Sequence, residues 1–485
     1  MDVEISTAGD ARRFQEDGSM TTRITPGATT ILLALAIVGG PLRAARATGD
    51  EIPEPERQAI AEKFAQRLAA GEFEEATEDF DEPMNRLMGS KTLAETWRKI
   101  ADQCGDFDGF GPARHEIVGN RDVYVFPGRW KGIALDMQVT VTSGGEVTGL
   151  FFKPVASSQP YKAPSYVSDE KFTERDLEFG HPDWRLKAKL SVPNGSRRAP
   201  GVVLVHGSGP NDMDETIGPN RPFKDLAWGL ASRGIVVLRY NKRTHTYGGA
   251  MKPGDVNVRA EVVDDAVAAL RTLREQPEVD PKKTFVIGHS LGGCLAPIIA
   301  EEDGQLAGVI VLAGTLRPME DVVIEQLEYI AGLPGAGQEE AKKILNSTRD
   351  ELETYRRGAA KENPTLMGVP MSYWQDLTSH LGDRGASAIR GFEGRVLVLG
   401  GGRDYQIKRV DFDLWREVLK GRSKATFQWV PDVNHLFCKG KGMSTPAEYM
   451  SAEKHVSSEV VKGVARWIKK GEYARKKSNK KQRAR

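Results

Sequence analysis

Three side chains of the types needed for acyl transfer stand in loops in the second half of the chain. Ser290, Asp404 and His435 each follow closely on a short apolar run. A serine hydroxyl attacks a carbonyl carbon when a histidine accepts its proton, and an aspartate fixes the tautomer of that histidine and stabilises the imidazolium. The three residues together therefore predict nucleophilic catalysis through an acyl-enzyme.

The serine lies in a stretch that has the composition of a sharp strand-to-helix turn. Gly288 and Gly292 stand two residues before and two residues after Ser290, where such a strained turn leaves no room for side chains. From Cys294 onward the residues are small and apolar and predict a helix. The free N–H groups and the positive dipole end of that helix favour negative charge at the serine.

Two backbone donors must meet the oxyanion that forms when the serine attacks. We expect one to be the N–H of Leu291, directly after the nucleophile. The other is expected from the loop that follows an earlier apolar strand, at Ser208 or at Gly207.

Four other side chains compete for the roles of base and orienting carboxylate: His455, Asp411, Asp413 and Asp432. The histidine falls at the start of an expected final helix, 455–469, rather than in a loop at a strand end. The first two aspartates look helical, and the third lies in the histidine loop itself. We therefore assign the roles to His435 and Asp404.

Four further polar residues near these loops have other expected roles. His206 and His289 are expected to be structural, shaping the oxyanion loop and the serine turn. Asp212 and Asp214 follow Pro210 and are candidates for binding a cation, but a solvated loop is the preferred interpretation.

Short apolar strands alternate with helices from Pro200 onward, which predicts a mainly parallel sheet covered by helices on both faces. Two earlier strands, at 171–179 and 184–192, are expected to form its antiparallel edge. Ligands in such sheets bind beyond the carboxyl ends of the strands, where all three loops of the trio fall. The expected fold of residues 166–470 is therefore a doubly wound, mostly parallel α/β sheet.

About 80 residues separate the strand that ends at Leu312 from the next one at Arg395, too many for a plain crossover. Helical patterns at 316–333, 339–357 and 373–381 fill this interval. They predict a helical cap at about 316–390 that covers the site and sets substrate choice.

An α+β module is expected at 52–154. Helical stripes come first, with a stop at Gly71 and a cap at Ser90, and four strands follow at 115–118, 122–126, 132–142 and 147–152. The module has no paired carboxylates, metal-ligand spacing or phosphate loop. Four aromatic residues are expected in its core rather than around a pocket: Trp97, Trp130, Phe151 and Phe152.

The two ends of the chain differ from the rest. Residues 1–47 predict a signal peptide, because an apolar run of about 13 residues, too short to cross a bilayer, precedes the cleavage-type sequence Ala45-Arg46-Ala47. Whether Met1 or Met20 starts the chain is open. A Ser/Pro/Lys-rich linker is expected at 155–165, and 471–485 form a basic tail, solvated by default, with weak contact to a polyanionic surface as the alternative.

Composition limits the classes of partner. The net charge of +1 gives no bulk field toward nucleic acid or an anionic membrane. Three cysteines, Cys104, Cys294 and Cys438, imply no disulfide framework. The expected location is secreted or periplasmic, and the oligomeric state is left open.

The motifs resemble the α/β-hydrolases of the secreted bacterial esterase type, which are grouped with serine aminopeptidase-like hydrolases. The resemblance is carried by 206–212, by Gly288-His289-Ser290-Leu291-Gly292-Gly293, by 401–406 and by Asn434-His435, all in family order. It implies hydrolysis of a small-molecule carboxylic ester without cofactor or metal. The module at 52–154 resembles a small cone-like domain of unknown function found ahead of such hydrolases. Met213 departs from the family, whose related loop often has arginine.

Other functions use the same trio. Aminopeptidases, thioesterases and acyltransferases share it, so the reaction class is better determined than the bond cleaved. A binding protein whose hydrolase domain has lost activity is disfavoured, because every required group is present. The acyl and alcohol specificity and the role of the N-terminal module are left open.

Overall fold

The computed structural model describes residues 52–118, 121–131, 135–154, 161–248, 251, 256–334, 338–359, 364–451 and 453–474. The expected signal peptide at 1–47 lies outside the described residues. So do residues 155–160 of the expected linker and all of the basic tail from 475 onward. Among the residues that are described, no helix is both long enough and apolar enough to cross a membrane.

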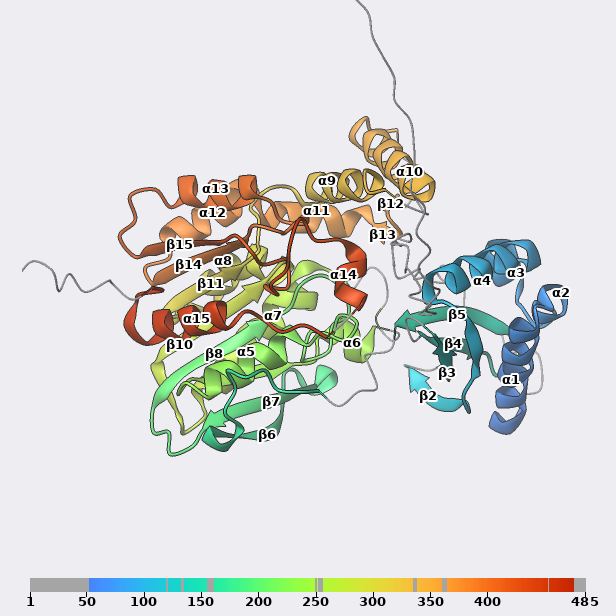
Figure 1. Ribbon diagram of the computed structural model, residues 1–485, viewed down its shortest axis with the longest axis horizontal. Helices are drawn as coiled ribbons and strands as arrows, with labels where there is room; N and C mark the ends of the chain where they lie inside the picture. The colour runs from blue at the N-terminus through green and yellow to red at the C-terminus, as the bar shows by residue number, and fades with distance from the viewer. Residues whose placement is uncertain are drawn as a thin grey trace, which may run out of the picture.

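The N-terminal unit, on the right of Figure 1, consists of helices followed by an antiparallel sheet, which confirms the expected α+β class. Its helices are α1 (Glu54–Ala70), α2 (Phe73–Ala76), α3 (Glu82–Met88) and α4 (Ser90–Cys104). Its strands are β1 (Phe107–Phe110), β2 (Arg114–Val118), β3 (Arg121–Trp130), β4 (Leu135–Val141) and β5 (Val147–Pro154). They run in the order β1-β3-β4-β5, with β2 also paired to β3.

Two details of this unit depart from the sequence pattern. Strand β1 was not expected, because it has only four residues and one of them is glycine. Ser90 is the first residue of α4 and its side chain makes no capping hydrogen bond, since Gly89 occupies the cap position. Gly71 ends α1 with a left-handed φ of 79°, as expected.

The aromatic residues of this unit pack together. The ring centroid of Trp97 lies 5.0 Å from that of Phe107, 5.3 Å from that of Trp130 and 6.0 Å from that of Phe152. Trp97, Trp130 and Phe152 are half-buried and pack against buried residues of α4 and β4, and Phe151 is half-buried as well. These aromatic residues therefore lie at the margin of the core rather than inside it.

The second sheet has eight strands in the order β15-β14-β11-β10-β8-β9-β7-β6. The strands are β6 (Phe172–Phe179), β7 (Leu186–Pro193), β8 (Ala199–Val205), β9 (Val236–Tyr240), β10 (Val279–His289), β11 (Gly308–Leu312), β14 (Arg395–Gly401) and β15 (Ala425–Val430). The six from β15 to β9 are parallel, and β7 and β6 add the expected antiparallel edge. Strands β9 and β11, residues 201–205 of β8 and residues 284–289 of β10 are buried, as a sheet covered on both faces requires.

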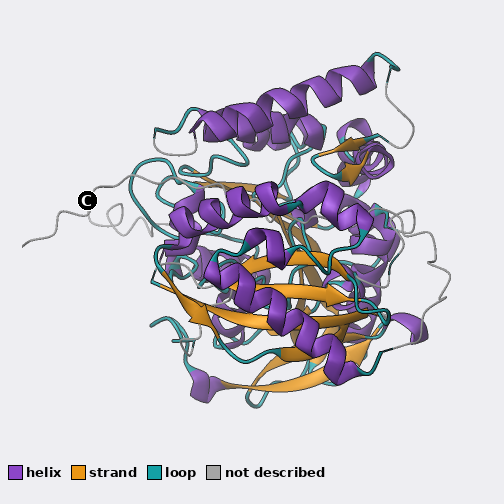
Figure 2. Ribbon diagram, turned by 90° about the vertical axis from the view of Figure 1, so that its right-hand side faces the viewer, coloured by secondary structure: helices purple, strands orange, loops and turns teal. Residues whose placement is uncertain are grey.

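Helices cover both faces of this sheet (Figure 2). Helix α5 (Pro222–Ala231) contacts α15 (Ser458–Lys470), whereas α7 (Asp264–Arg274), α8 (Leu291–Asp303) and α12 (Gly382–Gly391) form another layer. Outside the cap, the described part of this domain also contains α6 (Arg243–Tyr247), α13 (Arg409–Val418) and α14 (Pro446–Ser451). A π-helical turn, Arg259–Val263, leads directly into α7, the helix before β10. The final helix, α15, was expected to begin at His455 but begins at Ser458. The Ser457 side chain accepts the N–H of Glu459 and so caps the N-terminus of the helix.

The cap is made of α9 (Met319–Ala331), α10 (Gln338–Arg356) and α11 (Met371–His380), with a small hairpin of β12 (Thr365–Leu366) and β13 (Val369–Pro370). Helices α9 and α10 lie at the top of Figure 1, beyond the large sheet. Helix α12 lies inside the expected cap interval but packs against α8, so it belongs to the layer that covers the sheet.

Candidate active site

The three loops of the trio emerge at one edge of the large sheet. Ser290 follows β10, Asp404 follows β14 and His435 follows β15. These strands run parallel, so their carboxyl ends lie at the same edge. Topology therefore brings Ser290 to the same edge as two residues that lie more than one hundred positions further along the chain.

Ser290 occupies a strained turn between β10 and α8. Its φ of 51° and ψ of −116° lie in a region that side-chain-bearing residues rarely adopt. A Cβ on Gly288 would lie 2.1 Å from the carbonyl oxygen of Gly292, and one on Gly292 would lie 2.3 Å from that of Val205. Backbone atoms make both contacts and have little freedom to move. The two glycines are thus what permits this turn.

His435 is joined to Asp404 by a short hydrogen bond. The His435 Nδ1 lies 2.7 Å from Oδ2 of Asp404, and both side chains are buried. The other carboxylate oxygen accepts the N–H groups of Gln406 at 2.8 Å and Ile407 at 3.0 Å. With an ionised carboxylate as acceptor, the proton of the imidazole is on Nδ1, which leaves Nε2 able to accept one.

The four competing side chains have partners elsewhere. His455 contacts Asp225 at 3.0 Å. Asp411 binds Arg317, Asp413 binds Arg409, and Asp432 binds Lys439. None of the four is among the described residues that line the cavity around Ser290. Asp404 is therefore the carboxylate, among these candidates, that the structure pairs with His435.

The loop after β8 carries the second expected oxyanion donor. Gly207 packs against the serine, since a Cβ on it would lie 3.2 Å from the Cβ of Ser290. Its N–H, however, donates to Oε1 of Glu215 at 2.6 Å. The choice of Gly207 as a donor is therefore wrong in this structure, because a buried carboxylate holds that N–H. Ser208 remains, and it lines the same cavity as Ser290 and His435.

His289 links three loops of the site. Its Nε2 lies 3.0 Å from the carbonyl oxygen of His435, and its Nδ1 lies 3.0 Å from Oε2 of Glu215. Burial lowers the pKa of His289, but the neighbouring Glu215 carboxylate outweighs burial and the pKa is raised above its ordinary value. The same partnership, against the opposing effect of burial, lowers the pKa of Glu215.

His206 has the opposite electrostatic environment. It is buried at the end of β8, and burial lowers its pKa to about 4. It is therefore neutral near pH 7. Its ring packs against Phe223 and Tyr240, with centroid distances of 5.0 and 5.1 Å, in line with a structural role.

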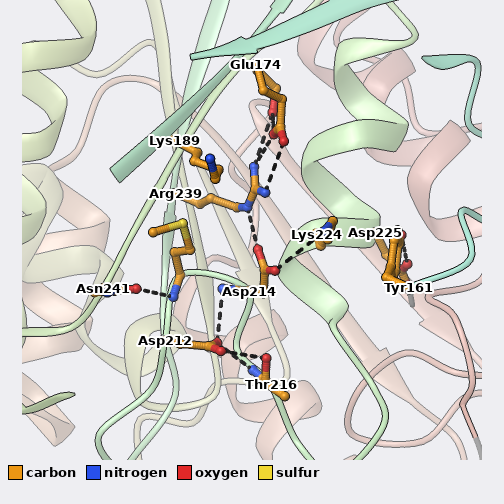
Figure 3. A network of polar contacts seen from close by, with 12 residues as sticks. Tyr161, Glu174, Lys189, Asp212, Asp214, Thr216, Lys224, Asp225, Arg239 and Asn241 are labelled. Carbon is orange, nitrogen blue, oxygen red and sulfur yellow. Dashed lines mark hydrogen bonds and ion pairs between the residues drawn. The ribbon is translucent and has the colours of Figure 1, made fainter. Parts of the chain in front are cut away.

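Asp212 and Asp214 belong to a polar network that also includes Thr216, Arg239 and Glu174 (Figure 3). Asp212 accepts the N–H and the hydroxyl of Thr216, at 2.9 and 2.7 Å. Asp214 accepts Nε of Arg239 at 2.7 Å, and this buried guanidinium also binds Glu174. Both carboxylates are half-buried, so the loop is solvated only in part, and the chain itself uses these oxygens. Across the described residues no cluster of three potential metal ligands occurs.

Ser290 and His435 open into a cavity of about 760 Å³ beneath the cap. Helices α9 and α11 and the hairpin between them contribute an apolar wall, which comprises Met319, Val323, Leu327, Ile330, Met367, Val369, Trp374 and Leu377. The carboxylates among the described lining are Glu215 and Glu261, and both have partners within the chain, as does His289 through Glu215. The cavity therefore suits a neutral, apolar ligand.

A parallel sheet with a strained serine turn and a histidine–aspartate pair at one edge defines an α/β-hydrolase. A profile of the alpha/beta hydrolase family matches residues 202–449, and the chain belongs to this family. A profile of a protein of unknown function (DUF3887) matches residues 61–150. The resemblance inferred from the motifs is thereby confirmed for both parts of the chain.

Individual relatives refine this assignment. The chain is 36% identical over 407 residues to esterase EstD of Thermotoga maritima, covering 84% of this chain and 94% of that protein. It is 27% identical over 175 residues to acylamino-acid-releasing enzyme 1 of Oryza sativa subsp. japonica, covering 33% of this chain and 21% of that one. The esterase PF2001 of Pyrococcus furiosus is similar at a TM-score of 0.37 and 17% identity, covering 57% and 89%. By the first of these relatives, the chain is an esterase-type hydrolase.

Sequence reasoning did not single out four residues around the oxyanion loop: Glu215, Lys242, Glu261 and Tyr373. Lys242 had one available signal, since it is the second residue after the strand that ends at Tyr240 and so falls at the carboxyl edge of the sheet. Glu261 had none, because it lies within a helical pattern whose orientation the sequence does not reveal. Tyr373 belongs to a segment, Ser372-Tyr373-Trp374, that resembles the cap of the family, but this resemblance does not indicate a contact with Glu261.

Proposed function

We propose that this protein is a secreted serine esterase that cleaves carboxylic esters with a neutral, apolar acyl group. Ser290 is the nucleophile, His435 the general base and then the general acid, and Asp404 the residue that orients His435. The observation that carries this proposal is the 2.7 Å bond between His435 and Asp404 beside a serine held in a strained turn that opens into the same cavity.

In the proposed reaction, Nε2 of His435 accepts the hydroxyl proton of Ser290 as the oxygen attacks the ester carbonyl. The N–H groups of Leu291 and Ser208 stabilise the oxyanion, and α8 directs its N-terminal end toward the same charge. The alcohol leaves with the proton held by His435. Water activated by His435 then hydrolyses the acyl-enzyme and restores the serine.

A fluorophosphonate probe tests the nucleophile. The wild-type protein should be labelled by the probe and should hydrolyse p-nitrophenyl esters. The Ser290→Ala variant should neither be labelled nor hydrolyse these esters, and its melting temperature should be unchanged. Labelling that persists in Ser290→Ala would refute the assignment of the nucleophile.

The bond cleaved is tested separately. Rates on short p-nitrophenyl esters are compared with rates on N-acylaminoacyl amides, which the name of the rice relative suggests as substrates. Faster hydrolysis of the amides would overturn the choice of ester. Secretion is tested by N-terminal sequencing of the mature protein, which should begin after Ala47.

A further inference from the structure

Lys242 lies outside the proposed triad and makes two side-chain hydrogen bonds to the oxyanion loop. Its side chain is buried, although lysine is rarely buried without a function or a partner. Its Nζ donates to the carbonyl oxygens of Gly207 at 2.9 Å and of Gly209 at 3.1 Å. The side-chain amide of Asn211 donates to the Gly207 carbonyl as well, at 3.1 Å. One ammonium group therefore binds two carbonyl oxygens of this loop, those of Gly207 and Gly209.

Peptide geometry gives these bonds a consequence for catalysis. In a trans peptide the C=O and the following N–H point in opposite directions. A Gly207 carbonyl that is held against Lys242 consequently turns the Ser208 N–H away from Lys242. Ser208 lines the cavity of Ser290, whereas Lys242 is not among the described residues that line it. The N–H of Ser208 is thus directed toward the cavity side of the loop.

The preceding peptide, between His206 and Gly207, is bound through its N–H rather than through its carbonyl. Glu215 binds the N–H of Gly207 and so keeps it away from the reacting atoms. The two charged groups therefore act on neighbouring peptides, and together they select which N–H faces the oxyanion. A positive charge on the carbonyl side also polarises the peptide and strengthens its N–H as a donor.

The charge of Lys242 is balanced by a residue that reaches the cap. Glu261, in the π-helical turn, lies 2.5 Å from the Lys242 Nζ through Oε1. Its Oε2 accepts the hydroxyl of Tyr373, on cap helix α11, at 2.5 Å. A second contact joins the same two segments, because the N–H of Val258 donates to Asp376 of α11 at 2.7 Å. A continuous set of short polar contacts thus connects the cap to the oxyanion loop.

We propose that Lys242 is a positioning residue that orients the Ser208 N–H for the oxyanion, and that Tyr373 and Glu261 make this orientation depend on the cap. The proposal rests on the proposed esterase function. Lys242 does not touch the substrate. It acts through the peptide between Gly207 and Ser208, so its removal should weaken the transition state more than the bound substrate.

The test is a double variant, Lys242→Met with Glu261→Gln, which removes both charges and leaves no buried ion unpaired. On p-nitrophenyl butyrate, kcat should fall on the order of 10- to 100-fold with little change in KM, less than the loss from deleting a donor outright. A trifluoromethyl ketone, which forms an oxyanion on the serine, should lose affinity by the same factor, whereas an alkyl alcohol of equal length should not.

The matched control is Arg274→Met with Asp303→Asn, a buried ion pair between α7 and α8 that does not line the cavity. It should lower the melting temperature and leave kcat unchanged. If the Lys242 double variant does not fold, Tyr373→Phe carries the test, since it removes one hydroxyl from the cap. It should lower kcat on the order of 2- to 10-fold at constant KM, which corresponds to about one net hydrogen bond.

The outcomes separate the two proposals. If the wild type hydrolyses esters through Ser290 and the folded double variant keeps its kcat and its affinity for the ketone, the role of Lys242 is refuted and the esterase stands. Equal losses for the ketone and the alcohol would also refute it, because they would indicate a general distortion of the site. A wild type without ester hydrolysis would overturn both.

Discussion

Asp404→Asn separates the charge of this side chain from its shape. Asparagine has the same outline, but one carboxylate oxygen becomes an NH₂ group. The N–H groups of Gln406 and Ile407 both point at Oδ1, so the amide must keep its oxygen there. The NH₂ then faces Nδ1 of His435, which has to accept. The imidazole proton moves to Nε2, and the base can no longer take the proton of Ser290.

The structure sets the size of this effect. Turning the amide over to restore the tautomer would leave two backbone N–H groups against an NH₂. Each unsatisfied donor costs about 1–3 kcal/mol, so the pair costs about 2–6 kcal/mol. At about 1.36 kcal/mol per decade, kcat should fall between about 30-fold and about 10⁴-fold, with the upper end near the loss of about 10⁴-fold known for the same change in serine proteases.

The assay is stopped-flow hydrolysis of p-nitrophenyl butyrate, with thermal unfolding measured in parallel. Asp432→Asn is the matched control, because this aspartate lies in the histidine loop and binds Lys439 at 2.8 Å on the exterior. It should keep kcat. A folded Asp404→Asn enzyme with kcat within threefold of the wild type would refute the tautomer argument.

Three further predictions concern the turn, the buried ion pair and the cavity. Gly292→Ala should destabilise the protein by on the order of 3 kcal/mol, because its Cβ would lie 2.3 Å from a backbone oxygen. In the wild type, charged His289 contributes stability that is complete below the unfolded pKa of about 6.5 and is lost as the pH rises through its raised folded pKa. Glu215→Gln should weaken this slope, since it removes the main partner that raises the pKa of His289 against burial and leaves only the His435 carbonyl and Asp404 to oppose burial. Leu327→Trp should fill part of the cavity beside the apolar wall. It should lower kcat/KM for octanoyl esters at least tenfold more than for acetyl esters.

Each of these has a measurement and an opposing result. Denaturant unfolding of Gly292→Ala is compared with that of Gly391→Ala. Apart from its chain neighbours and its own helix backbone, Gly391 has no atom within 4 Å of an added Cβ. Equal free energies of unfolding for the two variants would contradict the prediction for Gly292. For Glu215→Gln, free energies of unfolding are measured from about pH 5 to about pH 9. Parallel plots of this free energy against pH for variant and wild type would count against the ion pair of His289 with Glu215. A Leu327→Trp enzyme with unchanged chain-length preference would place the acyl group elsewhere.

Much of the scaffold follows from local pattern. The parallel strands are runs such as Val202–Val205, buried on both faces, and such runs are recognisable without knowing their neighbours. The serine turn is equally local, because its glycines lie two residues on either side. The π-helical start of the helix before β10 and the short strand β1 were missed, since neither changes the apolar periodicity enough to be visible.

The donors around the oxyanion could not be assigned in the same way. Gly207 and Ser208 are neighbours, and their N–H groups differ in direction only through what binds the peptides on either side. Those partners are Glu215 and Lys242, which are 8 and 35 residues from Gly207. Side-chain contacts over such separations depend on how strands and loops pack. No local pattern in a single sequence reveals that packing.

The identities of Ser290, Asp404 and His435 and their common edge of a sheet were already implied by residue types and by the order of strands and helices, because a parallel sheet aligns every strand's carboxyl end. Packing decided the rest. Tyr373 meets Glu261 across 112 residues, and it does so because α11 folds back over the π-helical turn. The cap's connection to the oxyanion loop is therefore a property of the assembled core, since it arises from contacts between segments that share no pattern along the chain.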